Sequence, residues 1–198
     1  MKEILGNLKG IRNSVIDELK TIYDIKLSSG QLLTTELALK LADITEFINR
    51  EISVYINRSG QVLSVAVGSN ESVELPNAEG RRKSSRLNGI RCVHTHPNGN
   101  SALSGVDISA LKNNRFDAMI AIGVTSPDYT ASTVSFGMIV GIDENEQFIT
   151  ESYCPMQLSE TENIYFPNLV NTVERILDKQ SDSTCLLYTS DAADEARS

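Results

Sequence analysis

The chain of 198 residues has no tryptophan, only two histidines and three cysteines, and an aromatic content of 6%. Cys92, Cys154 and Cys185 stand at unrelated spacings, which predicts neither a disulfide framework nor a CxxC metal site and favours a reducing compartment. The longest apolar run, at residues 118–124, is far shorter than the ~20 residues that cross a bilayer, and the amino terminus lacks a signal-peptide pattern. We therefore expect a cytoplasmic protein without a membrane partner.

The chain also has fewer basic than acidic residues. The chain has 18 Lys and Arg against 26 Asp and Glu, a net charge of -8, which argues against binding nucleic acid through bulk charge. We expect no sequence-specific nucleic-acid partner. One local basic cluster remains as a candidate docking surface, and it consists of Arg81, Arg82, Lys83, Arg86 and Arg91.

The end of the chain reads differently from the rest. The string CLLYTSDAADE at residues 185–195 resembles the translation of a transposon-type sequencing adapter. We set residues 185–198 aside as a non-native tail, and expect that the natural protein continues beyond residue 184. A natural disordered tail is the alternative.

Hydrophobic periodicity predicts a mixed α/β fold. Helices are expected at 4–22, 34–49, 107–113 and 158–177, the last interrupted near Pro167, and strands at 52–56, 62–67, 90–95, 118–124, 133–142 and 147–153. Helices followed by strands, then strand-helix-strand, then strands and a helix predict an α+β arrangement in which helices pack on a mixed sheet. Residues 1–50 are expected to form a helical pair that precedes the sheet.

Chemistry-bearing residues lie in one stretch, HTHPNGNSALSGVD at residues 94–107. Side chains two apart on an extended chain project to the same face, so His94 and His96 can point at one spot beyond a strand's end. Pro97 stops the strand pairing, and the loop after it lets the chain turn back.

A carboxylate follows at the start of the next predicted helix. Ser104 and Asp107 have N-cap to N3 spacing, where the helix dipole stabilises a carboxylate. Two neutral histidines and one carboxylate, with a fourth position left to water, form a catalytic zinc ligand set. We therefore predict that Zn²⁺ is bound by His94, His96 and Asp107. Ordinary strand histidines and a simple helix cap are the alternatives.

The pattern HTHP, six residues, then SGVD resembles the HxHP(x)nSxxD signature of the JAMM/MPN+ metallopeptidase superfamily, with the gap of its bacterial RadC-like branch. The resemblance implies a JAMM/MPN-like domain over residues 51–180, with a three-layer arrangement like that of cytidine deaminases. It also implies zinc-dependent hydrolysis of an amide or isopeptide bond in a peptide substrate.

The same resemblance assigns two catalytic residues. Ser104 matches the serine that stabilises the oxyanion. The family's general acid/base is a glutamate on an early strand, and Glu51, at the entry to the first predicted strand, is our choice for it. A solvated charge at a helix end is the alternative for Glu51.

A second resemblance covers about residues 3–180. The segments GNLKGIR at 6–12, INREI at 48–52, GR at 80–81 and RLNGIRCVHTHP at 86–97 resemble the amino-terminal extension of certain bacterial HflX-type GTPases. In that family a GTP-binding domain follows and the protein acts on ribosomes. This chain has no GxxxxGK[ST] phosphate loop, so GTP and Mg²⁺ are expected only in a missing downstream domain.

Three functions are therefore considered. The first is a zinc hydrolase, and the second is a non-catalytic module that docks a GTPase to the ribosome or to a protein through the basic cluster. The third, zinc-dependent nucleobase deamination, is disfavoured because that chemistry uses HxE and PCxxC motifs, which this chain lacks.

Overall fold

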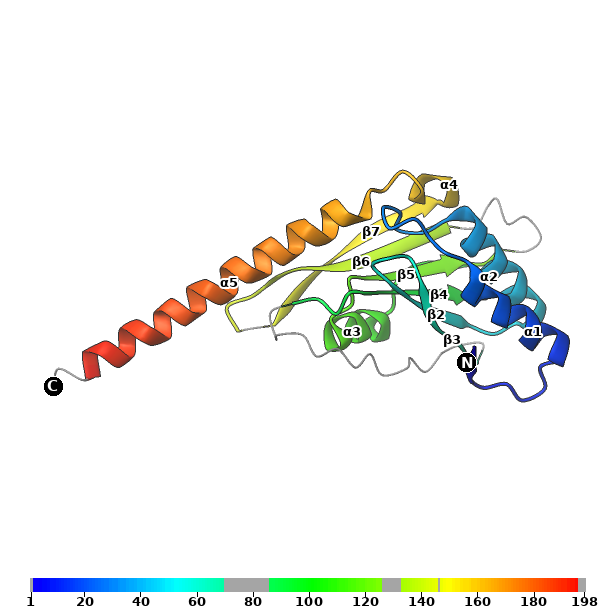
Figure 1. Ribbon diagram of the computed structural model, residues 1–198, viewed down its shortest axis with the longest axis horizontal. Helices are drawn as coiled ribbons and strands as arrows, with labels where there is room; N and C mark the ends of the chain where they lie inside the picture. The colour runs from blue at the N-terminus through cyan, green and yellow to red at the C-terminus, as the bar shows by residue number, and fades with distance from the viewer. Residues whose placement is uncertain (1, 70–85, 126–132, 146, 196–198) are drawn as a thin grey trace.

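The computed structural model describes residues 2–69, 86–125, 133–145 and 147–195, with side chains for all of these except 154 and 181–195. The elements are, in chain order, β1 (Ile4–Gly6), α1 (Asn13–Thr21), η1 (Ile22–Asp24), α2 (Thr35–Ile48), β2 (Ile52–Asn57), β3 (Val62–Val67), β4 (Ile90–His96), α3 (Gly105–Asn114), β5 (Ala118–Gly123), β6 (Thr133–Ile142), β7 (Phe148–Gln157), α4 (Leu158–Thr161) and α5 (Phe166–Glu195). The strands form one mixed sheet of order β1-β3-β2-β4-β5-β6-β7 (Figure 1). The predicted mixed α/β class is confirmed.

The sheet separates two layers of helix. Strands β1 and β3, and strands β4 and β5, pair in parallel, and the other neighbours are antiparallel. Paired residues share a face of a sheet, so Ser53, His94, Ala121 and Ser135 line one face in a row. Helix α3 covers that face, because a Cβ on Gly137 would meet Leu103 and Leu111. Helix α2 lies on the other face.

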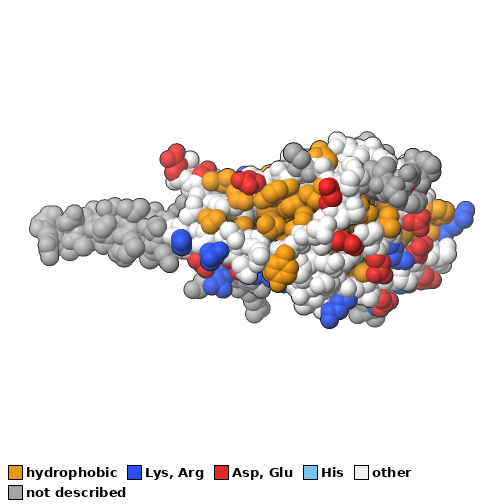
Figure 2. Space-filling view, turned by 90° about the horizontal axis from the view of Figure 1, so that it is seen from above, with side chains coloured by type: hydrophobic (Ala, Val, Ile, Leu, Met, Phe, Trp, Pro, Cys, Tyr) orange, Lys and Arg blue, Asp and Glu red, His pale blue; other side chains and the backbone are white. Residues whose placement is uncertain are grey.

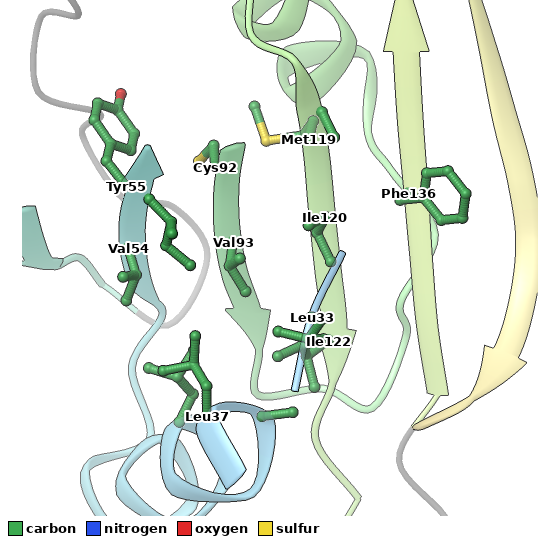
Figure 3. Close-up of a cluster of buried hydrophobic side chains, with 14 of the residues drawn as sticks. Leu33, Leu37, Val54, Tyr55, Cys92, Val93, Met119, Ile120, Ile122 and Phe136 are labelled. Atoms are coloured by element: carbon green, nitrogen blue, oxygen red, sulfur yellow. The ribbon is translucent and has the colours of Figure 1, made fainter. Parts of the chain in front are cut away.

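The core under α2 is apolar and continuous from the N-terminal helices to α5. Leu37 of α2 packs toward Val93 and Ile122 of the central strands, as Figure 3 shows. The same buried cluster includes Val15 and Leu19 of α1 and Leu177 of α5. Helices α1 and α2 therefore share one core with the sheet.

The predicted helix at 4–22 is wrong in its first half. Ile4–Gly6 is strand β1, which pairs with β3, and the helix begins only at Asn13. Gly6 and Gly10 have φ of 86° and 79°, which a right-handed helix excludes. Gly6 also lies so close to β3 that a Cβ would come within 2.2 Å of the Val67 carbonyl oxygen. The apolar spacing reflected packing on the core rather than one helix.

The remaining predictions differ mainly at element ends. The cap of α2 is Thr34, whose side chain accepts a hydrogen bond from the Leu37 N–H. Strand β7 runs to Gln157, past the predicted end at 153. The expected helix at 158–177 divides into α4 and α5, and Pro167 is the second residue of α5, near the first position that proline tolerates. Residues 70–85, which include Arg81, Arg82 and Lys83 of the basic cluster, lie outside the described residues.

Part of the surface is apolar. A band of hydrophobic side chains crosses the face seen in Figure 2. Exposed large apolar residues of the edge strand β7 and of α5 include Ile149, Tyr153 and Ile176. Among the described residues, no helix combines the length and the apolar character that a membrane span requires.

Candidate metal centre

Strand β4 carries both histidines to the α3 face of the sheet. His94 is 2% exposed and lies inside the ladder opposite Ser53 and Ala121, whereas His96 is the last residue of the strand. The two Nε2 atoms approach to 3.0 Å, with the rings edge to face. The alternation of the extended chain thus produces the predicted convergence of two imidazoles.

The loop after β4 orients His96. Its Nδ1 lies 2.6 Å from the backbone carbonyl oxygen of Asn100. A carbonyl oxygen only accepts, so Nδ1 of His96 carries the proton that it donates. In the neutral ring Nε2 then has a free lone pair, and it faces His94. A backbone carbonyl that fixes the tautomer in this way is the usual outer partner of a metal-binding histidine.

Close packing holds this loop against the sheet. A Cβ on Gly123 of β5 would come within 2.3 Å of the Gly99 carbonyl oxygen and 2.8 Å of the Ser101 nitrogen. The buried hydroxyl of Ser101 hydrogen-bonds to the hydroxyls of Thr133 and Ser135, at 2.9 and 3.1 Å. Glycine at position 123 therefore lets the loop lie directly on β5, beside the histidines.

Asp107 reaches the histidines from the first turn of α3. Its Oδ2 accepts hydrogen bonds from the backbone N–H and the hydroxyl of Ser104, both at 2.7 Å, in a capping box. Its Oδ1 lies 3.2 Å from Nε2 of His94. Burial acts to raise the pKa of Asp107, but the hydrogen bond and charge of His94 and the Ser104 hydrogen bonds outweigh it, so the pKa lies well below its ordinary value.

These three side chains can hold one cation. One ligand atom from each of His94, His96 and Asp107 lies within 4.8 Å of the other two. Because His96 Nε2 is an acceptor, a single proton on His94 Nε2 serves both His96 Nε2 and Asp107 Oδ1. A divalent cation that replaces this proton meets two imidazole nitrogens and a carboxylate oxygen, a donor set that suits zinc.

A buried pair of unpaired polar atoms fits the same assignment. Within the described part of the chain, neither Nδ1 of His94 nor Oγ of Ser53 has a hydrogen-bond partner. The two residues are direct partners across β2 and β4, and Ser53 is 1% exposed. When a cation takes Nε2, the proton of neutral His94 belongs on Nδ1, the atom that has no partner in the described chain.

Glu51 is not a solvated helix-end charge, as the alternative reading had it. Its side chain is 8% exposed, and it precedes β2 by one residue on the face that carries Ser53 and His94. Burial raises the pKa of Glu51, the charge of His94 opposes this shift, and the charge of Asp107 adds to it. A buried carboxyl with a raised pKa, in the field of both His94 and Asp107, is suited to general acid/base work.

Ser104 has a different position from the one expected of an oxyanion donor. Its hydroxyl donates to Asp107 Oδ2 and accepts from the Asp107 N–H at 3.2 Å. Both bonds belong to the helix cap, so donation to a substrate oxygen requires the hydroxyl to rotate away from Asp107.

The basic cluster is not one exposed surface. Arg91 is fully buried, donates to the carbonyl oxygens of Gln31, Leu32 and Asn57, and places its guanidinium over the Phe166 ring. The prediction that Arg91 serves docking is therefore wrong. Arg86 is exposed and lies 3.8 Å from Asp178, and residues 81–83 fall outside the described part of the chain.

Sequence reasoning missed the supporting residues. The Asn100 group is a backbone carbonyl, so the residue type gives no signal for it. Ser53 and Gly123 lie against residues that are distant along the chain. Only the glycine could have drawn attention, since glycine inside a strand often marks close backbone approach.

Comparison with known proteins identifies no relative of this chain. A scan against protein-family models, a search of curated proteins and a search of solved structures each gave no match.

Proposed function

We propose that the chain is a zinc-dependent hydrolase of the JAMM type that cleaves an amide or isopeptide bond. The observation that carries the proposal is the convergence of ligand atoms from His94, His96 and Asp107 to within 4.8 Å, beside the buried carboxyl of Glu51. Helical layers on both faces of a mixed sheet are compatible with the three-layer JAMM/MPN arrangement.

Each protein group has a role that its surroundings support. A zinc ion held by His94, His96 and Asp107 would supply Lewis acidity to a carbonyl group and to a water molecule. Glu51 takes the proton of the attacking water and returns it to the leaving amine, for which its raised pKa is favourable. Ser104, once its hydroxyl turns from Asp107, donates to the carbonyl oxygen as charge develops there.

The test compares Glu51→Gln with Glu36→Gln, an exposed glutamate in the first turn of α2. Wild type and Glu36→Gln are expected to cleave members of a fluorogenic peptide library or a lysine-linked isopeptide in a zinc-dependent manner. Glu51→Gln is expected to keep one zinc per chain and to lose turnover by about 10²–10⁴-fold. Unchanged turnover in Glu51→Gln, or turnover that survives zinc chelation, would contradict the proposal.

We further propose that this chain is the amino-terminal part of an HflX-type ribosome-associated GTPase. The sequence segments at 6–12, 48–52 and 86–97 support that kinship. Salt-dependent co-sedimentation of the chain with ribosomes, without zinc-dependent turnover, would favour a docking role over hydrolysis.

A further inference from the structure

The β2–β4 ladder ends at His94, within the candidate site. The paired residues run from Asn57 and Ile90 to Ser53 and His94. The same register would next pair Ile52 with Thr95, and then Glu51 with His96. The Ile52 N–H instead donates to the side-chain hydroxyl of Thr95, at 3.0 Å. A side chain therefore replaces the backbone ladder between the strand that leads from Glu51 and the strand that carries the histidines.

A second hydroxyl supports this contact from α2. Thr95 Oγ1 lies 2.7 Å from Oγ1 of Thr45, and both threonines are 0% exposed. The two hydroxyls and the Ile52 N–H form a buried set in which each group has a partner. The set lies on the α2 face of the sheet, whereas the imidazoles of His94 and His96 lie on the α3 face.

We propose that Thr95, supported by Thr45, is a positioning residue that sets how far Glu51 stands from the metal ligands. Ile52 is the residue after Glu51, and Thr95 stands between His94 and His96. One hydrogen bond between Ile52 and Thr95 thus joins the two backbone segments that carry the base and the ligands. This role rests on the hydrolase function proposed above.

Loss of the hydroxyl has a definite local consequence. A buried N–H left without an acceptor costs about 1–3 kcal/mol, so Ile52 must shift toward another acceptor or admit water. A shift of Ile52 moves Glu51, because the two residues share a peptide unit. The imidazoles, on the opposite face, keep their own contacts, which join His96 Nδ1 to the Asn100 carbonyl oxygen and His94 Nε2 to Asp107.

The experiment compares Thr95→Val, which removes the hydroxyl, with Thr95→Ser, which retains it. In Thr95→Val the Ile52 amide is expected to lose hydrogen-exchange protection. In the Co²⁺-loaded protein, the paramagnetic shift of the Glu51 side-chain carboxyl ¹³C is expected to change while the visible spectrum of the metal does not. Hydrolytic kcat is expected to fall by about 10–100-fold with little change in KM. Thr95→Ser should restore all three values, as general destabilisation would not.

The outcomes separate the two proposals. Wild-type Ile52 protection in Thr95→Val, or an unchanged Glu51 shift in a chain that binds Co²⁺ normally, would overturn the positioning role alone. Failure of wild-type protein to bind Co²⁺ would refute the hydrolase proposal and the positioning role together. If Thr95→Val does not fold, Thr45→Val removes only the supporting hydroxyl, and the same two measurements on it decide the matter.

Discussion

The imidazole of His96 donates its Nδ1 proton to the Asn100 carbonyl oxygen across 2.6 Å, and this leaves Nε2 as the atom that faces His94. The loop between Pro97 and Ser104 therefore does more than connect β4 to α3. Its backbone selects the tautomer of His96 in which Nε2 carries no proton and is free to bind a cation. The following predictions concern the groups around this contact.

The pKa of His96 should lie below that of an ordinary histidine. Burial and the neighbouring charge of His94 lower its pKa, and the Asn100 hydrogen bond and Asp107 only partly oppose them. The unfolded chain, with a histidine pKa of about 6.5, binds this proton first, so stability falls as pH drops below that value. In chelator-treated protein, the NMR midpoint of His96 is expected below 6.5 and closer to it in His94→Ala. A wild-type midpoint at or above 6.5 would contradict the assigned surroundings.

Ser104→Ala should weaken the start of α3 and the carboxylate it holds. The change removes the cap of the helix and one hydrogen bond to Asp107, at a cost of about 0.5–2 kcal/mol. The pKa of Asp107 should rise toward its ordinary value, as carboxyl ¹³C shifts would report. The matched control is Ser109→Ala in the same helix, where the hydroxyl donates a hydrogen bond to the Gly105 carbonyl oxygen and does not cap the helix. Equal melting temperatures for the two variants would argue against the cap.

Glu51→Gln should raise the melting temperature at neutral pH. Because burial raises the pKa of Glu51, the folded state binds its proton more tightly than the unfolded state. Stability from this group is present at low pH and declines as pH rises through the raised pKa. Glutamine removes that loss, so the melting temperature of the variant should exceed that of wild type.

The pH dependence supplies the control for that variant. The difference from wild type should vanish below about pH 4, where the carboxyl is protonated in both states. Glu36→Gln, at an exposed site, should show no such pattern. A lower melting temperature for Glu51→Gln at pH 7 would mean that the Glu51 carboxylate stabilises the fold.

Gly123→Ala should displace the loop after β4. The added Cβ meets backbone atoms of Gly99 and Ser101 at 2.3–2.8 Å, and overpacking of this kind costs about 1–3 kcal/mol. Zinc affinity, measured by competition with a chelator, is expected to fall by about tenfold or more. Gly105→Ala meets nothing within 4 Å and should leave both stability and affinity near wild type. Equal affinities in the two variants would show that the loop position is unimportant.

The local features of the fold were readable from the sequence. Period-two alternation predicted β2 and β3, and the spacing of Ser104 and Asp107 predicted the cap of α3. These features depend on residues within a few positions of one another. Strand β1 was missed because its three residues become a strand only by pairing with β3, some 60 residues later.

The candidate site likewise has features that local sequence predicts and features that depend on packing. The approach of His94 to His96 follows from strand alternation, and the position of Asp107 follows from a helix cap. The burial of Glu51 and the hydrogen bond from Ile52 to Thr95 depend on how strands and α2 pack, which no local pattern encodes. Arg91 was misassigned for that reason, since a guanidinium can be buried when carbonyl oxygens accept its protons.

The most direct test of the account is the metal content of the purified chain. After dialysis against a weak chelator, elemental analysis is expected to give one zinc per wild-type chain, and none in His94→Ala or Asp107→Asn. Both variants need a folded circular-dichroism spectrum for the comparison to hold. Wild-type protein without zinc, bound iron in place of zinc, or one zinc retained in folded His94→Ala would contradict the assignment of His94, His96 and Asp107 as a zinc site.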